Sequence, residues 1–193
     1  MPTVVSAKDA LRAKMRTLRR GLPKSFRADA EAKILAEFSR LLKTFPEGSL
    51  VAGYLAQGAE VDAGPLLHKA SEAGFITALP VVKGEDAALA FYPWRPDEAL
   101  THGAFGIRVP SRQDEEVFPG VCLVPLLAFD AKGHRLGQGG GYFDRTIPKL
   151  KAGGNVLAVG LAFAAQEVPA IPFAGHDHPL DAILTEKGLR RFQ

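Results

Sequence analysis

Residues 120–145 read GVCLVPLLAFDAKGHRLGQGGGYFDR, and this stretch decides the fold. Its first part, Gly120 to Leu127, is a short, mostly apolar run with the length of a buried strand. Five glycines follow between positions 133 and 141, and a helical pattern runs from Tyr142 to Lys151. A buried strand, a glycine-rich loop and a helix in this order are typical of α/β proteins.

Outward from this stretch, short apolar runs bounded by turn residues alternate with helical stretches. We expect strands at Leu50–Leu55, Phe75–Val81, Ala87–Tyr92, Gly120–Leu127, Val156–Phe163 and Ala182–Thr185, and helices at Gly64–Ala73 and Tyr142–Lys151. This alternation predicts an α/β fold, a three-layer sandwich with a mainly parallel sheet and helices on both faces. No repeat or long linker divides the chain, so we expect one domain over 1–193, with basic N-terminal helices (1–45) packed on an α/β body (48–193).

The arm at 1–45 holds eleven Lys and Arg against four Asp and Glu, a local charge of +7 that leaves −4 for the rest of the chain. Ser6 with Asp9 three residues later is a helix-start signal, and Gly21 and Pro23 should end this first helix. A second amphipathic helix is expected over Pro23–Lys43.

The first helix has an apolar stripe flanked by cations. The stripe comprises Leu11, Met15, Leu18 and Leu22, and the strip beside it comprises Lys8, Arg12, Arg16 and Arg19. One interpretation is a solvated basic face whose stems cover the docking seam. The other is a set of cations that reach back to hold a polyphosphate. We expect the second for Lys8 and Arg12, and solvation for Arg16, Arg20 and Arg27.

The composition excludes several classes of protein. With 193 residues, 47% hydrophobic and 23% charged, the chain is able to bury a core and is unlike a disordered chain. Its longest apolar run, Val156 to Ala165, is shorter than the roughly 18 residues of a membrane helix, and it has no signal-peptide pattern. The single Cys122 is expected to be a core residue in a reducing compartment. We therefore expect a cytoplasmic monomer with no membrane partner.

The glycine-rich loop suits an anion. A loop poor in side chains lets backbone N–H groups converge on a phosphate, and the following helix adds its positive end. Arg135 and Arg145 offer forked donors, and Asp144 offers a carboxylate for Mg²⁺. The loop is neither a Walker A loop nor a dinucleotide fingerprint, because Tyr142 stands where the third glycine of the latter belongs. The alternative is a flexible turn that only needs positive φ values.

The same residues carry a family resemblance. Leu123-Val-Pro-Leu-Leu-Ala-Phe-Asp, followed by Gly133 through Arg145, resembles the signature of the 5-formyltetrahydrofolate cyclo-ligases, also called 5,10-methenyltetrahydrofolate synthetases. Shorter pieces occur in the family's order along nearly the whole chain: Lys8 and Arg12, Tyr54-Leu55 and Glu60, Phe105-Gly-Ile with Pro110, and His176-Asp with Leu180-Asp-Ala-Ile-Leu-Thr-Glu186. Two positions depart from the pattern: Phe143, where the family commonly has a second tyrosine, and Val109, where an acidic residue often precedes the proline.

The resemblance implies an ATP- and Mg²⁺-dependent conversion of 5-formyltetrahydrofolate to 5,10-methenyltetrahydrofolate, with release of ADP and phosphate. A formamide is a poor electrophile, so its oxygen must become a better leaving group before the ring closes. Phosphorylation of that oxygen by ATP supplies the leaving group, and the substrate's own N10 then attacks. The protein is asked for positioning and positive charge rather than for a catalytic Ser or Cys.

The resemblance also assigns roles to residues. It implies catalytic roles for Arg135, Lys8 and Arg12. The ATP site comprises Lys8, Arg12, Gly133, Arg135, Leu136, Gly137, Gln138, Gly139, Gly140, Gly141 and Tyr142. Reduced folate falls to Tyr54, Glu60 and Tyr142, and Mg²⁺ to Asp144 and Asp181.

Three smaller signals stay open at this stage. Glu60, next to Asp62 and Gly64, would without the resemblance be interpreted as an acid at the start of a helix. Trp94, between Pro93 and Pro96, either stacks on the pterin or plugs the end of the sheet. His176-Asp177-His178 has the look of a metal chelate but lacks further ligands, so we expect a turn there.

Two rival functions are an RNA-binding module that uses the basic helices and a phosphosugar-handling α/β enzyme. We expect no nucleic-acid partner, because the positive charge is confined to one arm and aromatic residues are not interleaved with it.

Overall fold

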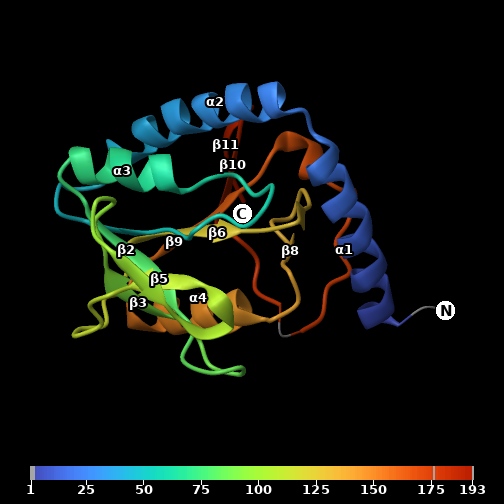
Figure 1. The fold of residues 1–193 in the computed structure, drawn as a ribbon. Coiled ribbons are helices and arrows are strands. Elements are labelled where there is room, and N and C mark those ends of the chain that lie inside the picture. Colours follow the sequence, from blue (N-terminus) through green and yellow to red (C-terminus); the bar gives the residue numbers. More distant parts are fainter. Residues whose placement is uncertain (1–2, 176, 193) are drawn as a thin grey trace.

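The computed structural model describes residues 3–175 and 177–192. Its centre is a seven-stranded sheet in the order β11-β10-β9-β6-β1-β2-β3 (Figure 1). The strands span β1 Leu50–Ala52, β2 Ile76–Val81, β3 Ala90–Pro93, β6 Val121–Pro125, β9 Leu157–Leu161, β10 Ala182–Thr185 and β11 Gly188–Arg191. The five strands from β10 to β2 are parallel, and β3 and β11 close the two edges in the antiparallel sense. The predicted mainly parallel α/β sheet is confirmed.

The central strands are buried on both faces, which is why they are continuous apolar runs rather than alternating ones. In β6, Val121 and Leu123 face one core cluster, while Cys122 and Val124 face the other. Burial raises the pKa of the Cys122 thiol to about 12, so this side chain is a protonated core residue, as predicted.

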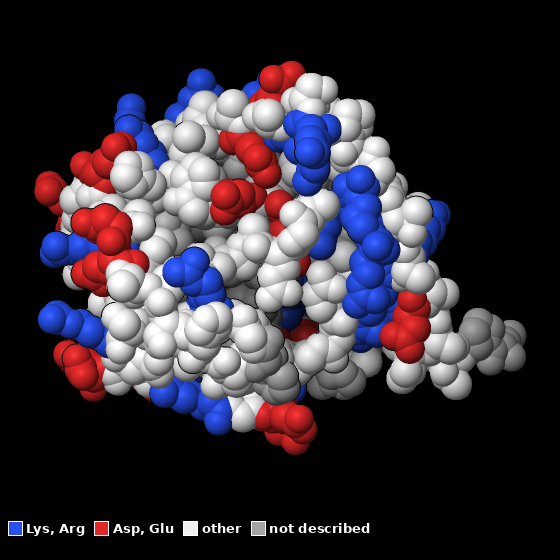
Figure 2. Space-filling view, in the orientation of Figure 1, with Lys and Arg blue, Asp and Glu red and all other residues white. Residues whose placement is uncertain are grey.

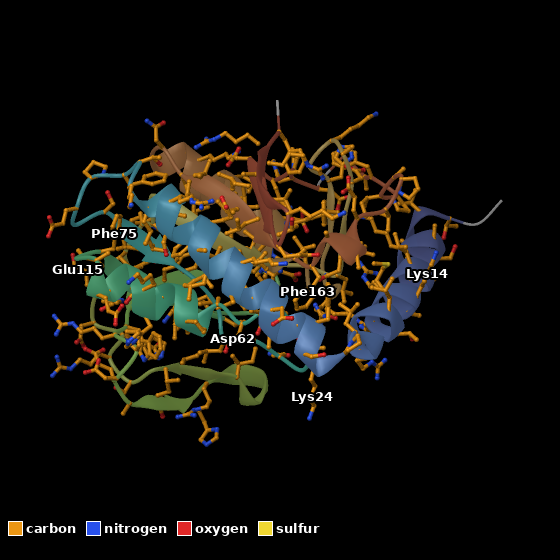
Figure 3. The ribbon with its side chains drawn as sticks, turned by 90° about the horizontal axis from the view of Figure 1, so that it is seen from above. Lys14, Lys24, Asp62, Phe75, Glu115 and Phe163 are labelled. Carbon is orange, nitrogen blue, oxygen red and sulfur yellow. The ribbon has the colours of Figure 1, made fainter. Side chains whose placement is uncertain are left out.

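Helices cover both faces of the sheet and give the expected three layers. α2 Lys24–Leu42 and α3 Gly64–Glu72 lie on one face, and α4 Tyr142–Gly153 lies on the other (Figure 1). Ile34 and Phe38 of α2 are fully buried against the sheet. Seen from above, α2 and α3 run side by side, with Phe163 beside the first turns of α2, where its ring contacts Phe26 (Figure 3).

α1, Val4–Gly21, lies at the flank of the sandwich rather than on either face of the sheet (Figure 1). Met15, the buried residue of its apolar stripe, packs with Leu127 and Leu136. The predicted helix start at Ser6 is wrong, because the Thr3 hydroxyl accepts from the Ser6 amide and caps the helix one turn earlier.

Short elements complete the chain: β4 Leu100–His102, β5 Arg108–Pro110, β7 Ala128–Phe129, β8 Arg135–Leu136, and the 3₁₀ turns Ala104–Gly106 and Ala164–Gln166. Three predictions need correction: the strand predicted over Leu50–Leu55 ends at Ala52, the strand predicted over Ala87–Tyr92 begins only at Ala90, and one more strand, β11, follows Ala182–Thr185. Within the described residues, no helix is both long and apolar enough to cross a bilayer.

The topology locates a binding site. From β1 the chain crosses to β2 on one side, whereas β6 lies on the other side of β1. The connections after β1 and β6 therefore diverge at their carboxyl ends, where open α/β sheets leave a crevice for ligands.

Candidate active site

A cavity of about 910 Å³ opens at the carboxyl ends of β1, β2 and β6. Its charged lining comes mainly from α1 and residues 135–145, and the cations are Lys8, Arg12, Arg135 and Arg145. Its apolar lining comes mainly from the segments that follow β1 and β2 and includes Leu55, Pro80, Val82, Leu89, Ile107 and Phe143. In Figure 2 a stripe of Lys and Arg along α1 borders the hollow. The cavity thus has a polar half and an apolar half.

The floor of the polar half is a run of free main-chain amides. Among the described residues, no protein oxygen accepts a hydrogen bond from the amides of residues 137–143. Gly139 has φ +119° and Gly141 has φ +65°, left-handed values that favour glycine, and Gly141 is the N-cap of α4. Consecutive free amides at a helix N-terminus form an anion-binding site.

Two glycines of the loop have close neighbours where a side chain would lie, whereas Gly137 and Gly139 have space around them. A Cβ at Gly140 would come within 2.8 Å of the Tyr142 ring, and one at Gly141 would come within 2.8 Å of Arg145 Nη1. Gly133 is different: it turns the β7–β8 hairpin at φ +81° and packs against Leu180 and Phe192, outside the cavity lining. Positive φ explains Gly133, Gly139 and Gly141 as turn residues, and the free amides from residue 137 onward add the feature that the anion interpretation needs.

Arg135, the most buried cation of the cavity lining, forms an ion pair with Asp144. Arg135 Nη2 lies 2.8 Å from Asp144 Oδ1, which also accepts from the His178 amide at 3.1 Å, and Arg135 Nη1 donates to the His178 carbonyl. Burial lowers the pKa of Arg135, and the Asp144 charge opposes that effect, so the guanidinium stays charged. The pair holds the Arg135 guanidinium in a fixed position beside the free amides, with its charge balanced by that of Asp144.

α1 brings Arg12 to the glycine loop and Lys8 to Asp177, and both side chains lie in the cavity lining. Lys8 Nζ contacts both carboxylate oxygens of Asp177, at 2.6 and 2.7 Å. Arg12 Nε donates to the Gly137 carbonyl at 3.1 Å, and Arg12 Nη1 lies 2.6 Å from Asp9 Oδ1. Both side chains therefore line the cavity while held by internal acceptors.

The expectation of solvation is wrong for Arg16 and holds for Arg20. Arg16 donates to the Gln138 side-chain oxygen at 3.0 and 3.1 Å, whereas Arg20 is exposed. Arg27 is half-buried, and its Nε is buried without a hydrogen-bond partner in the described residues, so it too departs from the expectation.

Tyr54 and Glu60 lie together next to the glycine loop. The Tyr54 hydroxyl donates to the Val61 carbonyl at 2.7 Å, and burial, followed by the charge of Glu60, raises the pKa of this phenol well above its usual value. Glu60 is 9% exposed and accepts from the Gln57 amide at 3.0 Å and from Gln138 Nε2 at 3.2 Å. Glu60 does not cap α3, whose N-cap is Ala63.

Arg19 is buried and paired, which its place in the basic strip of the first helix did not predict. It is 5% exposed, donates to the Leu126 carbonyl at 3.1 Å, and lies 3.5 Å from Glu60 Oε1. Burial lowers its pKa, and Glu60 opposes that effect. A signal was present: Arg19 is one turn after Met15 and so shares the docking face of α1.

Arg145 ties the loop to its surroundings. Arg145 Nη2 donates to the carbonyls of Gly140 and Glu85, both at 2.8 Å, and Nε donates to the Ala87 carbonyl at 3.3 Å. Arg145 therefore holds the glycine segment against the 83–89 segment, which itself adds Asp86 and Leu89 to the lining.

The two predicted metal ligands lie apart. Asp181 stands before β10 at the amino edge of the sheet, outside the cavity lining, where it contacts Lys151 at 2.6 Å and the Ala158 amide at 2.8 Å. Asp144 lies at the carboxyl edge. The part of the chain that the structure describes contains no group of three or more His, Cys, Asp or Glu side chains arranged to hold a metal.

The remaining candidates divide between cavity and core. Leu136 and Tyr142 line the cavity. Trp94 does not: it is buried in the core under α2 and α3 and donates to the Glu98 carbonyl at 3.1 Å, so it plugs the sheet. Val109 packs in an apolar cluster with Val81 and Tyr92. His178 lines the cavity, and His176 lies outside the described residues.

Comparison with known proteins gives a consistent result. The model of the 5-formyltetrahydrofolate cyclo-ligase family matches residues 4–186. The 5-formyltetrahydrofolate cyclo-ligase of Escherichia coli strain K12 is 34% identical over 140 residues, 70% of this chain and 76% of that protein. The enzyme of that name from Mycolicibacterium smegmatis is 33% identical over 94% of both chains.

Solved structures agree in fold. The chain superposes on the 5,10-methenyltetrahydrofolate synthetase of Aquifex aeolicus with a TM-score of 0.75 and 32% identity, over 96% of this chain and 93% of that one. The synthetase of Mycoplasma pneumoniae gives a TM-score of 0.73 at 21% identity, over 93% of this chain and 98% of that one, and this second likeness shows the fold alone.

Proposed function

Because the chain belongs to the 5-formyltetrahydrofolate cyclo-ligase family, we propose that its cavity binds ATP in the polar half and 5-formyltetrahydrofolate in the apolar half, and converts them to 5,10-methenyltetrahydrofolate, ADP and phosphate. The observation that carries this proposal is the run of free amides over residues 137–143, bordered by cations and adjoining an apolar pocket. A polyphosphate is the ligand whose chemistry matches such a floor.

The reaction proceeds in two steps in this proposal. The formyl oxygen takes the γ-phosphoryl group of ATP, and ADP leaves. N10 of the substrate then forms a bond to the formyl carbon and releases its proton to solvent, the C–O bond breaks, and inorganic phosphate departs with that oxygen. The protein holds the two reactants in line and stabilises the charge spread over the transferred phosphoryl group.

The polar half supplies the positive charge. The free amides and the N-terminus of α4 take the phosphate oxygens, and Arg135 adds a charge that is fixed before ATP arrives. Lys8 and Arg12 turn from Asp177 and Asp9 toward the triphosphate when it is present. Exchange of an internal acceptor for a phosphate keeps each cation paired throughout the cycle.

The residues fit a magnesium ion that arrives with ATP, but not one held by the protein alone. Mg²⁺ is commonly bound through one or two carboxylates together with substrate phosphates. Asp144 meets this need because only its Oδ1 is engaged by Arg135 and His178, whereas Asp181 is at the opposite edge of the sheet. Bound there, the ion would neutralise charge on the β- and γ-phosphates.

The apolar half suits the reduced folate. Leu55, Val82 and Ile107 offer flat apolar contacts to a ring system, and Tyr54 and Glu60 offer polar atoms at its boundary with the loop. The carboxylate of Glu60 is matched to the N–H groups of a pterin-like ring. Tyr142, which lines the cavity at the start of α4, borders both halves.

The test is an absorbance assay for the methenyl product, whose chromophore absorbs in the near ultraviolet. Purified protein is given 5-formyltetrahydrofolate with ATP and Mg²⁺, with each omitted in turn. We expect product only when the folate and ATP are both present, with one ADP formed per product. Product without ATP, or no product from folded protein, would overturn the proposal.

A further inference from the structure

One side chain of the glycine loop reaches out of the polar half. Gln138 Nε2 donates to Glu60 Oε1 at 3.2 Å, across the boundary between the two halves of the cavity. The Gln138 side-chain oxygen is held at the same time by Arg16 Nε and Nη2, at 3.1 and 3.0 Å. The amide is therefore oriented with its donor toward Glu60, because Arg16 has only donors and must face the oxygen.

The other contacts of Glu60 come from outside the loop. The Gln57 amide donates to Oε2 at 3.0 Å, and Arg19 Nη2 lies 3.5 Å from Oε1. Arg19 is itself fixed by the Leu126 carbonyl at the end of β6. Of the contacts that the described residues make with this carboxylate, only that of Gln138 belongs to the segment proposed to bind phosphate.

We propose that Gln138 is a positioning residue that couples the two halves of the cavity, so that nucleotide in the loop raises the affinity of Glu60's half for the reduced folate. This inference rests on the proposed function, because it assumes a phosphate in the loop and a folate beside Glu60. In this proposal the side-chain amide of Gln138 links the phosphate-binding loop to the folate-binding carboxylate of Glu60.

The physical reason is the state of the loop. Residues 138–140 are exposed, and their amides have no protein acceptor among the described residues, while Arg16 and Arg145 hold the carbonyls of Gln138 and Gly140. The N–H side of this segment is therefore fixed only when a ligand accepts its hydrogen bonds. A triphosphate that takes these amides fixes the backbone of Gln138, and its side chain then holds Glu60 in one orientation. The entropic cost of ordering Glu60 when the folate binds is then smaller. By thermodynamic linkage, the folate must raise the affinity for nucleotide by the same factor.

The experiment measures coupling rather than rate. Calorimetry gives the Kd of 5-formyltetrahydrofolate with and without a saturating non-hydrolysable ATP analogue and Mg²⁺, for the native protein and for Gln138→Met. Methionine keeps the length of the side chain and removes its amide. Gln113→Met makes the same chemical change at an exposed position outside the cavity lining and is the matched control.

We expect the analogue to tighten folate binding about fivefold in the native protein and in Gln113→Met, a typical coupling between two sites. In Gln138→Met the ratio should fall to about one. An equal loss of affinity in both states, with the ratio kept, would mean that Gln138 is only structural and would overturn the inference. A native ratio of one would also overturn it while leaving the proposed function intact, whereas failure of the analogue to bind at all would defeat both.

Discussion

Two aspartates have nearly the same contacts, although one lies at the carboxyl ends of the parallel strands (the carboxyl edge) and the other at their amino ends (the amino edge). Asp144, at the carboxyl edge, pairs with Arg135 at 2.8 Å and accepts from a backbone amide at 3.1 Å. Asp181, at the amino edge, pairs with Lys151 at 2.6 Å and accepts from a backbone amide at 2.8 Å. Only Asp144 lies beside free amides in a cavity. Of these two similarly paired carboxylates, only Asp144 is therefore placed where a ligand in the cavity would meet it.

Burial separates the two pairs energetically. The Arg135 side chain is 4% exposed, whereas that of Lys151 is 43% exposed. A buried ion pair contributes little net stability, because the cost of desolvating the two charges offsets their attraction. An exposed ion pair has a small desolvation cost and contributes about 0–1 kcal/mol to stability. A buried pair that faces a cavity is better explained by ligand binding.

The largest effect is expected for Arg135→Ala, which removes the fixed charge of the carboxyl edge. We expect kcat/KM for cyclisation to fall by about 100-fold or more, because this charge should stabilise the transferred phosphoryl group. The protein should stay folded by circular dichroism. Arg190→Ala is the control, since Arg190 makes a surface pair with Glu167. Equal kinetics in the two variants would show that the loop has been misassigned.

A smaller effect should separate the two aspartates directly. Asp144→Asn should lower kcat/KM by more than about tenfold and raise the Mg²⁺ concentration needed for half-maximal rate. Asp181→Asn removes a carboxylate of the amino edge, so its kinetics and Mg²⁺ dependence should match those of the native enzyme. A steady-state Mg²⁺ titration of both variants makes the measurement. Loss of activity in Asp181→Asn alone would invert the comparison.

The smallest effect concerns the hairpin that delivers Arg135. Burial alone would raise the pKa of Asp130, but the amides of Ile171 and Lys132 and the ring of His134 outweigh it and lower the pKa below 3.8. The folded state therefore holds its proton less tightly than the unfolded state. The resulting stability is present above pH 3.8 and is lost as the pH falls through the folded pKa.

The check on Asp130 is a series of urea unfolding curves at falling pH. Asp130→Asn should show a flatter decline of the unfolding free energy below pH 3.8 than the native protein. Identical acid limbs in the two proteins would remove Asp130 from the account of the hairpin.

Much of the sheet could be predicted because its central strands are buried on both faces. Runs such as Val121–Pro125 and Leu157–Leu161 are apolar throughout and bounded by turn residues. β11 was missed because its burial is only partial, and its sequence, GLRR, has no strand pattern. β4 and β5 are three residues each, too short for a period to be recognised.

The site was predictable to the extent that it is local in sequence. Residues 137–142 are contiguous, so their composition alone indicated an anion loop. The pairing of Arg19 with Glu60 joins residues 41 positions apart, and that of Lys8 with Asp177 joins residues 169 apart. Such pairs depend on how α1 docks, which no local pattern specifies. Asp181 shows the converse: the resemblance alone assigned it to the metal site, and it lies at the amino ends of the strands, away from the cavity.

The most direct test of the central claim is a ¹H–¹⁵N titration of the protein with ATP and Mg²⁺, followed at each backbone amide. The account predicts that the amides from Gly137 to Phe143 show the largest shifts and saturate together, because they exchange water for phosphate oxygens. Saturation of binding with these amides unmoved, and with the largest shifts in another segment, would contradict it.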